Sequence, residues 1–248
     1  MKAIILVAGR GTRLSKYTKD LPKCMLEFGG KTLIQRQVDT LREAGISDIT
    51  LVKGYLAEKI QIPGVKYLVN ERYAETNMVG TLMCAKEEMN EDMLVCYGDI
   101  IYEEQVLRAV LEDKSDVGVV VDKDWRPYWV ARHGCDSIDT ESVVIGGGGN
   151  IIELGKADPP PEKAKVRYVG LIKFSKKGVE QMKRVYDGNP ALFDTSYMTD
   201  FLQAIIDTGL RVDPIVISHG WLEFDTNEDY EKMTALLEAG ALSSLFKI

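Results

Sequence analysis

The stretch Leu6-Val7-Ala8-Gly9-Arg10-Gly11-Thr12-Arg13-Leu14 decides the fold class, because an apolar run passes directly into a loop rich in glycine and arginine. Residues 3–8 are continuously apolar, which is typical of a strand buried on both faces of a parallel sheet. Glycine lets the backbone turn sharply and bring its N–H groups close to a phosphate chain. The stretch therefore predicts a strand that carries a phosphate-binding loop at its end.

Strand-like and helix-like segments alternate after this loop. Strands are predicted at residues 49–53, 65–69, 93–97 and 117–121, and helices at 33–45, 79–89 and 103–112. Short connections between alternating strands and helices favour parallel pairing with helices on both faces. The first half therefore predicts an α/β fold with a doubly wound, mostly parallel, Rossmann-like sheet.

The pattern changes after residue 121. A hairpin is predicted from residues 142–145 and 151–154, which flank the glycine-rich segment 146–150. Further strands are predicted at 169–174 and 212–217, and helices at 197–207 and 230–238. We expect a single domain over residues 1–248: a nucleotide-binding half at 1–121, a small β-rich acceptor-binding half at 122–230 and a C-terminal helical segment at 231–248.

Composition excludes several classes of protein. Hydrophobic residues make up 45% of the 248 residues, enough for a real core, and the net charge of −7 argues against a general nucleic-acid or anionic-membrane binder. No apolar run approaches the roughly 18 residues that span a bilayer. The four cysteines lack metal-ligand spacing and are interpreted as reduced thiols of a cytoplasmic protein; they are Cys24, Cys84, Cys96 and Cys135.

Three phosphate-binding motifs compete for the glycine-rich segments. The dinucleotide fingerprint needs a small residue where Leu14 stands, and a P-loop at Gly30-Lys31-Thr32 needs glycine where Met25 stands. The pyrophosphorylase-type signature, Gly-x-Gly-Thr-Arg-Leu followed by Pro-Lys, matches at every position and ends at Pro22-Lys23. An ordinary strand-to-helix turn is the alternative, and the complete match favours phosphate binding.

With these residues the chain resembles the sugar nucleotidyltransferase superfamily and, within it, the bacterial phosphocholine cytidylyltransferase-like enzymes. The likeness runs from Met1 to about Tyr230. It is also carried by Gly54-Tyr55-Leu56, Asn70-Glu71-Arg72-Tyr73-Ala74, Asn77, Gly98-Asp99, Tyr168-Val169-Gly170 and Glu223-Phe224-Asp225. The resemblance implies a nucleotide-diphospho-sugar transferase fold and a Mg²⁺-dependent enzyme that joins CTP to a small phosphorylated alcohol or amino alcohol, such as phosphocholine, and releases pyrophosphate.

The same resemblance implies which residues bind the nucleotide. The loop would hold the triphosphate, and the segments around Gly54 and Asn77 would line the base and ribose pocket. Lys23 and Arg13 would neutralise charge at the reacting phosphorus. The expected nucleotide-binding residues are Leu6, Ala8, Gly9, Arg10, Gly11, Thr12, Arg13, Lys23, Gly54, Tyr55, Asn77, Thr81 and Gly98.

Carboxylates at two distant points of the chain suggest a magnesium site. Asp99 follows a predicted strand at its carboxyl end, where ligands sit in open α/β sheets. Glu223 and Asp225 share one face of a strand-like segment by the two-residue period. Mg²⁺ usually takes one or two carboxylates together with substrate phosphates. The resemblance implies Asp99 and Asp225 as catalytic metal ligands with Glu223 assisting; helix capping or a solvated turn is the alternative for each.

The acceptor site is predicted from aromatic and charged side chains of the second half. Aromatic faces bind quaternary ammonium groups, so the three tryptophans are candidates for a cage, although packing onto the sheet is the commoner role of such rings. Arg132 and Lys156 are candidates for the acceptor's phosphate, with solvated surface charge as the alternative. The full predicted acceptor set is Trp125, Trp129, Arg132, Lys156, Gly170, Asp200 and Trp221.

Other functions remain open at this stage. A sugar-1-phosphate, inositol-phosphate or phosphonate nucleotidyltransferase with a different nucleotide or acceptor would fit the same architecture, and so would a catalytically inactive nucleotide sensor. A glycosyltransferase is disfavoured, because Ile100-Ile101 follows Asp99 where an Asp-x-Asp motif is expected. The expected partners are CTP and a small phosphate-bearing acceptor, with no nucleic acid or membrane, and a homodimer is left open.

Overall fold

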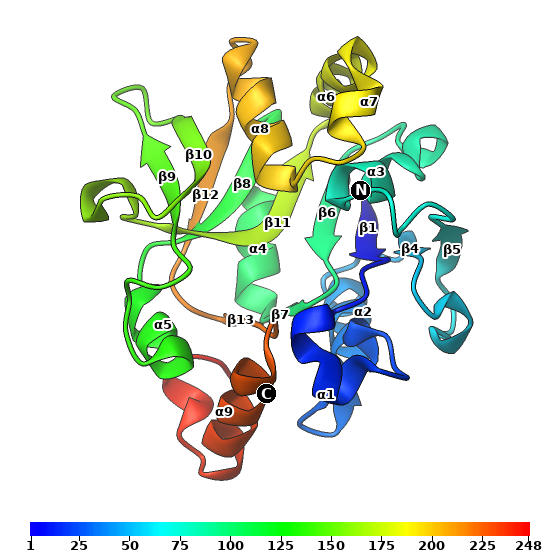
Figure 1. Cartoon of the computed structure of the whole chain (residues 1–248). Helices are drawn as coiled ribbons and strands as arrows, with labels where there is room; N and C mark the ends of the chain where they lie inside the picture. The colour runs from blue at the N-terminus through cyan, green and yellow to red at the C-terminus, as the bar shows by residue number, and fades with distance from the viewer.

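A seven-stranded mixed sheet runs through the computed structural model, which describes residues 1–248 (Figure 1). Its strand order is β12-β8-β11-β6-β1-β4-β5, and neighbours are parallel except at β11, which is antiparallel to β6 and β8. The strands are β1 (Lys2–Val7), β4 (Ile49–Lys53), β5 (Lys66–Val69), β6 (Met93–Tyr97), β8 (Val117–Asp122), β11 (Arg167–Phe174) and β12 (Asp213–Ile217). The predicted mostly parallel sheet is confirmed.

Three two-stranded ribbons extend this sheet. They are β2 (Glu27–Phe28) with β3 (Lys31–Thr32), β9 (Glu141–Ile145) with β10 (Ile151–Ala157), and β7 (Ile100–Tyr102) with β13 (Trp221–Glu223). The β9–β10 ribbon is the predicted hairpin, and it projects at the upper left of Figure 1 beside α8. The β7–β13 ribbon joins the chain after Asp99 to the chain before Asp225, so it sets the spacing between these two carboxylates.

Helices cover both faces of the sheet, as the doubly wound prediction requires. They are α1 (Ser15–Thr18), α2 (Leu33–Glu43), α3 (Met78–Met83), α4 (Glu104–Glu112), α5 (Arg126–His133), α6 (Lys176–Gly188), α7 (Pro190–Phe193), α8 (Met198–Asp207) and α9 (Asn227–Glu238). Short 3₁₀ turns lie at Thr12–Leu14, Lys23–Met25, Ala57–Lys59, Lys86–Glu88, Pro161–Lys163 and Leu242–Ser244.

The two core layers follow from the alternation of side chains along β1. Ala3, Ile5 and Val7 point to one face and pack in the cluster that includes the apolar stripes of α2 and α4. Ile4 points to the other face, where α3, α6 and α8 contribute the buried side chains. Both faces of the central strand are therefore covered, which explains its continuous apolar run.

Several helix boundaries differ from the predictions. The helix predicted at residues 79–89 ends at Met83, and a separate 3₁₀ turn follows at Lys86–Glu88. Helix α9 begins at Asn227, three residues earlier than predicted, because Thr226 and Asp229 form a capping box. Helices α5 and α6 were not predicted at all.

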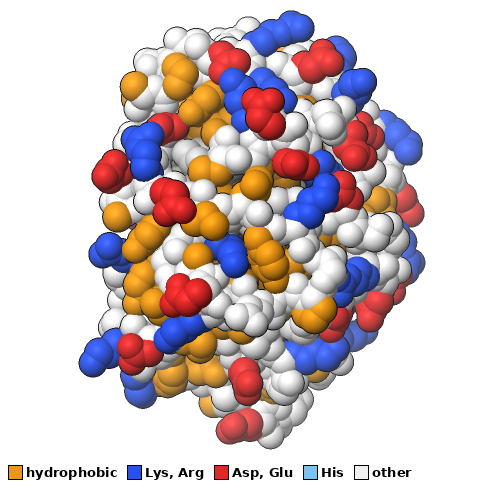
Figure 2. Space-filling model, turned by 90° about the vertical axis from the view of Figure 1, so that its right-hand side faces the viewer, with side chains coloured by type: hydrophobic (Ala, Val, Ile, Leu, Met, Phe, Trp, Pro, Cys, Tyr) orange, Lys and Arg blue, Asp and Glu red, His pale blue; other side chains and the backbone are white.

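The surface carries both signs of charge. On the face shown in Figure 2, acidic and basic side chains are interspersed, in keeping with the modest net charge of −7. No helix of the structure has the combination of length and apolar character that crossing a bilayer requires.

Candidate active site

A cavity of about 260 Å³ opens at the edge of the sheet where β1 and β6 end. This is the carboxyl edge of the parallel strands, the usual ligand site of such sheets. Predicted nucleotide residues in its wall are Leu6, Ala8, Gly9, Gly11, Thr12, Arg13, Lys23, Asn77, Thr81 and Gly98. Asp99 and Asp225 line it as well. The structure thus brings most of the predicted nucleotide and metal residues to one place.

The cavity wall also contains residues that were not predicted. They are Val7, Cys24, Tyr73, Thr76, Met78 and Tyr97. Tyr73 lies within the segment 70–74 that carries the family resemblance, and Thr76 directly precedes Asn77, so both positions offered a signal in the sequence. Three predicted nucleotide residues, Arg10, Gly54 and Tyr55, are absent from the wall.

Two glycines give the cavity its shape. Gly11 has a φ of 61°, in the left-handed region that disfavours side chains, and a Cβ there would lie 3.1 Å from Cβ of Lys23. A Cβ at Gly98 would lie 2.5 Å from the carbonyl oxygen of Leu6. Gly54 plays a supporting part, because it lets the following residue donate its N–H to the Ala8 carbonyl oxygen at 3.0 Å.

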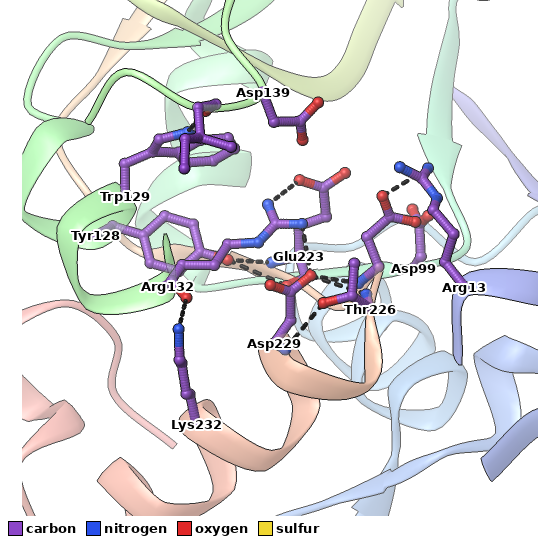
Figure 3. A network of polar contacts seen from close by, with 12 residues as sticks. Arg13, Asp99, Tyr128, Trp129, Arg132, Asp139, Glu223, Thr226, Asp229 and Lys232 are labelled. Atoms are coloured by element: carbon purple, nitrogen blue, oxygen red, sulfur yellow. Dashed lines mark hydrogen bonds and ion pairs between the residues drawn. The ribbon is translucent and has the colours of Figure 1, made fainter. Parts of the chain in front are cut away.

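The Lys23 side chain joins the carboxylates of Asp99 and Asp225. Its Nζ lies 2.7 Å from Oδ2 of Asp99 and 2.8 Å from Oδ1 of Asp225. Arg13 Nη2 lies 2.6 Å from the other oxygen, Oδ2, of Asp225. Two cations from the N-terminal part of the chain are therefore placed against the carboxylates that follow β6 and β13, and Figure 3 shows Arg13 near Asp99 at its right.

Burial and charge oppose each other in this cluster. Burial raises the pKa of Asp99, the nearby Glu223 and Asp225 carboxylates raise it further, and the Lys23 ammonium only partly offsets them. Burial also acts against the charged form of Lys23, but the two carboxylates outweigh it and raise its pKa. Lys23 consequently stays a cation, and its charge opposes the rise in the pKa of Asp99.

No covalent nucleophile accompanies these charges. Cys24 lies in the wall beside Lys23, but burial raises the pKa of its thiol to about 12, which keeps it protonated. The site can therefore hold and orient anionic groups, whereas an attacking atom has to come from a substrate.

The carboxylates fit a divalent cation that shares its ligands with a phosphate chain. Oδ1 of Asp99 is buried without a hydrogen-bond partner, and it belongs to a carboxylate in the wall of the cavity. No group of three or more His, Cys, Asp or Glu side chains is arranged to hold a metal alone. Mg²⁺ commonly takes one or two carboxylates and completes its shell with water and phosphate oxygens. Asp99 and Asp225 satisfy that requirement.

Glu223, the third predicted metal ligand, is engaged elsewhere. Its carboxylate forms an ion pair with the buried guanidinium of Arg132, and Arg132 Nη2 lies 2.8 Å from Oδ2 of Asp229 (Figure 3). Burial acts against the charged form of Glu223, yet Arg132 and Arg167 outweigh it and lower its pKa. Arg132, predicted to bind the acceptor's phosphate, instead directs its two Nη groups at carboxylates of the protein.

The three tryptophans pack inside the molecule. Trp125, Trp129 and Trp221 are 1%, 0% and 2% exposed, and their rings stack edge-on with each other or with Tyr128. Trp221 Nε1 donates to Asp122 Oδ2 at 2.9 Å, and Trp129 Nε1 donates to the Ile138 carbonyl oxygen at 2.7 Å. Trp125 Nε1 is buried without a hydrogen-bond partner. Because all three rings are buried, they offer no open face to a ligand, so a tryptophan cage has no support from this geometry.

The remaining predicted acceptor residues lie in different settings. Lys156 is exposed and pairs with Glu153 at 2.6 Å, away from the cavity wall. Asp200 lies exposed in the first turn of α8. Gly170 has a φ of 87° at an irregularity of β11 and allows the Tyr97 ring to pack directly on the backbone.

A polar group that was not predicted lies on the acceptor side. Glu141, at the start of β9, has a pKa raised by burial and by the carboxylates of Glu223, Asp139 and Asp200, against the lowering effect of Arg167. The hydroxyl of Tyr168 is buried beside these carboxylates without a hydrogen-bond partner. Carboxylates therefore outnumber the guanidinium of Arg167 around Glu141, and neither Glu141 nor Tyr168 lines the cavity.

Comparison with known proteins identifies the class. The model of the MobA-like NTP transferase domain family matches residues 3–215. The CTP:phosphoglutamine cytidylyltransferase of Campylobacter jejuni is 35% identical over 249 residues, covering 93% of this chain and 98% of that protein. The choline-phosphate cytidylyltransferase of Streptococcus pneumoniae is 31% identical over 156 residues, covering 61% and 67%.

Solved structures show the same fold. The CTP:phosphocholine cytidylyltransferase from Streptococcus pneumoniae superposes with a TM-score of 0.73 at 24% identity, covering 95% of this chain and 98% of that chain. The inositol-1-phosphate CTP transferase from T. maritima superposes with a TM-score of 0.73 at 20% identity, covering 100% and 98%.

Fold and cavity together define a nucleotidyltransferase, an enzyme that transfers a nucleotidyl group. The chain belongs to the MobA-like NTP transferase domain family. The predicted resemblance to sugar nucleotidyltransferases, with the phosphocholine cytidylyltransferases as near relatives, is confirmed.

Proposed function

We propose that this protein joins CTP to a small phosphate-bearing acceptor, giving a CDP-linked product and pyrophosphate. The observation that carries the proposal is the position of Lys23, whose ammonium lies between Asp99 and Asp225 in the wall of a cavity formed by the glycine-rich loop. That arrangement supplies a cation for phosphate and two carboxylates for a metal within one site. CTP is favoured because the two cytidylyltransferase relatives are 35% and 31% identical.

The residues of this chain act by binding and orienting. The loop from Gly9 to Arg13 would bind the triphosphate. Its turn requires a left-handed φ, which Gly11 provides. Lys23 and Arg13 would move from the carboxylates onto phosphate oxygens, since both are within reach of the cavity. A phosphate oxygen of the acceptor would then attack the α-phosphorus and the P–O bond to pyrophosphate would break, so positioning and charge neutralisation provide the catalysis.

Asp99 and Asp225 are the residues that we assign to Mg²⁺. Both carboxylates lie in the cavity wall, and the unpartnered Oδ1 of Asp99 leaves one coordinating atom free. When bound, the ion would neutralise charge on the phosphate chain and orient it for in-line displacement. Glu223 would support the site from behind through its ion pair with Arg132.

The acceptor that fits this site carries a positive group as well as a phosphate. On the side that we assign to the acceptor, Glu141 feels the carboxylates of Asp139, Asp200 and Glu223 against the guanidinium of Arg167, and Glu223 is already paired with Arg132. An ammonium or amino group on the acceptor would offset this charge and could lie against the rings of Tyr97 and Tyr168. Choline phosphate and phosphoglutamine, the acceptors named for the two relatives, both have such a group.

A panel of substrates tests the proposal. Pyrophosphate release is measured with CTP, UTP, dTTP and ATP, each against phosphocholine, phosphoethanolamine, a phosphorylated amino acid, inositol phosphate, an aminoalkylphosphonate and glucose 1-phosphate. Release with CTP and an amino-bearing acceptor supports the proposal. Release only with a sugar phosphate and UTP or dTTP would contradict it, and nucleotide binding without any release would favour an inactive sensor.

A further inference from the structure

Arg132 lies at the centre of a buried ion network behind the cavity. It occupies the last turn of α5, is 1% exposed and pairs with Glu223 and Asp229 at the same time (Figure 3). The three residues come from α5, β13 and α9, so the network ties three elements together. It includes no residue of the cavity wall.

The network holds the backbone of a proposed metal ligand. Oδ2 of Asp229 accepts the Arg132 guanidinium at 2.8 Å and also the N–H groups of Asp225 at 3.1 Å and Thr226 at 2.9 Å. The Thr226 hydroxyl in turn accepts the N–H of Asp229 at 3.1 Å. One carboxylate oxygen therefore connects Arg132 to the corner at which β13 passes into α9.

Helix α5 also contacts the segment before this corner, through hydrogen bonds of Tyr128. The Tyr128 hydroxyl accepts the N–H of Glu223 at 2.8 Å and donates to the Glu223 carbonyl oxygen at 3.1 Å. The side chain and the backbone of Glu223 are thus both held by α5. Asp225 is two residues further along, so its carboxylate is placed by a segment that is fixed on both sides.

Arg132 differs from the other two cations of the site in its freedom to move. The Arg13 side chain is 66% exposed, and both Arg13 and Lys23 line the cavity, so each can turn toward a bound phosphate. Arg132 is buried and does not line the cavity, and both of its Nη groups are already paired with carboxylates of the protein.

We infer that Arg132 is a positioning residue for nucleotidyl transfer: through Asp229 and Glu223 it fixes the corner that presents Asp225 to the metal–phosphate complex. The inference rests on the proposed function, because it assigns the metal to Asp99 and Asp225. It predicts that loss of Arg132 weakens the metal-dependent part of nucleotide binding and leaves the metal-free part unchanged. Residues that orient metal ligands from behind commonly contribute about 10–100-fold to metal affinity or activity.

The test compares CTP affinity in Mn²⁺ with CTP affinity in EDTA, by calorimetry, for wild type, Arg132→Met and Arg132→Lys. The wild type is expected to bind CTP more tightly in Mn²⁺. Arg132→Met is expected to lose about tenfold or more of that gain, with metal-free affinity within about twofold, and Arg132→Lys to recover part of it. If Arg132→Met does not fold, Asp229→Asn gives the same readout, because it removes the carboxylate that links Arg132 to the backbone of Asp225 and Thr226.

Lys173→Met is the matched control. Lys173 is also buried, and its Nζ lies 2.9 Å from Oδ2 of Asp113. In the sheet, Lys173 of β11 lies opposite Leu94 near the start of β6, so it is at the other end of the strands from the cavity. This variant is expected to lose thermal stability and to keep the full Mn²⁺ gain.

Two results of these titrations have distinct meanings. An unchanged Mn²⁺ gain in every Arg132 and Asp229 variant, with stability lost as in Lys173→Met, would overturn the positioning role and leave a structural one. Wild type that binds no CTP in either condition would instead contradict the proposed function.

Discussion

Replacing Lys23 with methionine removes the one cation that contacts both catalytic carboxylates. Its Nζ lies 2.7 Å from Asp99 and 2.8 Å from Asp225, and the three side chains are only 11–18% exposed. Removing one partner of a buried ion pair costs about 3–5 kcal/mol, and the residual exposure of this site favours the lower end. A loss of about 3 kcal/mol corresponds to a fall in Tm of roughly 6–12 °C for a protein of this size.

The same substitution should suppress catalysis. Loss of one preorganised charge at the reacting phosphate commonly lowers kcat by about 10²–10³. Thermal unfolding and pyrophosphate release are measured on Lys23→Met and on the double variant Lys23→Met/Asp99→Asn. The double variant should regain most of the lost stability and should stay inactive, because Asp99 is the carboxylate that loses its cation partner, whereas Asp225 keeps its ion pair with Arg13 at 2.6 Å. A Lys23→Met enzyme within threefold of wild-type kcat, or a double variant no more stable than the single one, would refute this reasoning.

Three other predictions concern single side chains. Because burial raises the pKa of Asp99, the acid limb of the kcat/KM profile should lie above pH 3.8, with activity lost as the pH falls through that raised pKa. Asp99→Asn should abolish most turnover. Since ionising this buried carboxylate costs stability above pH 3.8, the variant should be at least as stable as wild type in urea unfolding at pH 7. Trp129→Phe should lower the free energy of unfolding by about 1–3 kcal/mol through lost packing and a lost hydrogen bond, and the KM for the acceptor should stay within twofold of wild type. A large rise in that KM with unchanged stability would instead support the hypothesis of a tryptophan cage. Gly98→Ala should lower the free energy of unfolding by about 1–3 kcal/mol and weaken CTP binding in calorimetry, because its Cβ would meet the Leu6 carbonyl. The control Gly147→Ala has open space around the new methyl group and should stay within about 0.5 kcal/mol of wild type. Equal effects of the two substitutions would contradict the steric argument.

The nucleotide side of the site could be predicted because its information is local. The glycine loop and the aspartate after β6 each follow a strand whose apolar run is visible in the sequence, and the proline-lysine pair completes the signature that the loop begins. A parallel sheet then brings the carboxyl ends of β1 and β6 to one edge, which places Asp99 beside the loop without further information.

Helices α5 and α6 escaped prediction for identifiable physical reasons. In α5 the buried residues Tyr128, Trp129 and Arg132 follow helical spacing, but one of them is charged, so the stripe does not look apolar. In α6 the buried set begins with Gly178, a poor helix former that is needed because a Cβ there would collide with the Asp116 carbonyl. Close approach of two distant segments cannot be read from the residues of either one.

The role of Arg132 could not be predicted for a related reason. An arginine beside tryptophans in a polar segment suggests a ligand for phosphate, and its actual partner Asp229 lies 97 residues further along the chain. The capping box of Thr226 and Asp229 is local in the sequence, whereas the acceptance of a buried guanidinium by Asp229 requires α5 to pack against α9.

Transfer of radiolabel from [α-³²P]CTP tests the central claim most directly. The enzyme is incubated with this nucleotide, Mg²⁺ and the acceptor that supports pyrophosphate release, and the products are separated. Attack of a phosphate oxygen on the α-phosphorus predicts that all the label consumed appears in a CDP-linked product, with one unlabelled pyrophosphate for each. Label appearing as CMP or CDP, or release of orthophosphate in place of pyrophosphate, would contradict it.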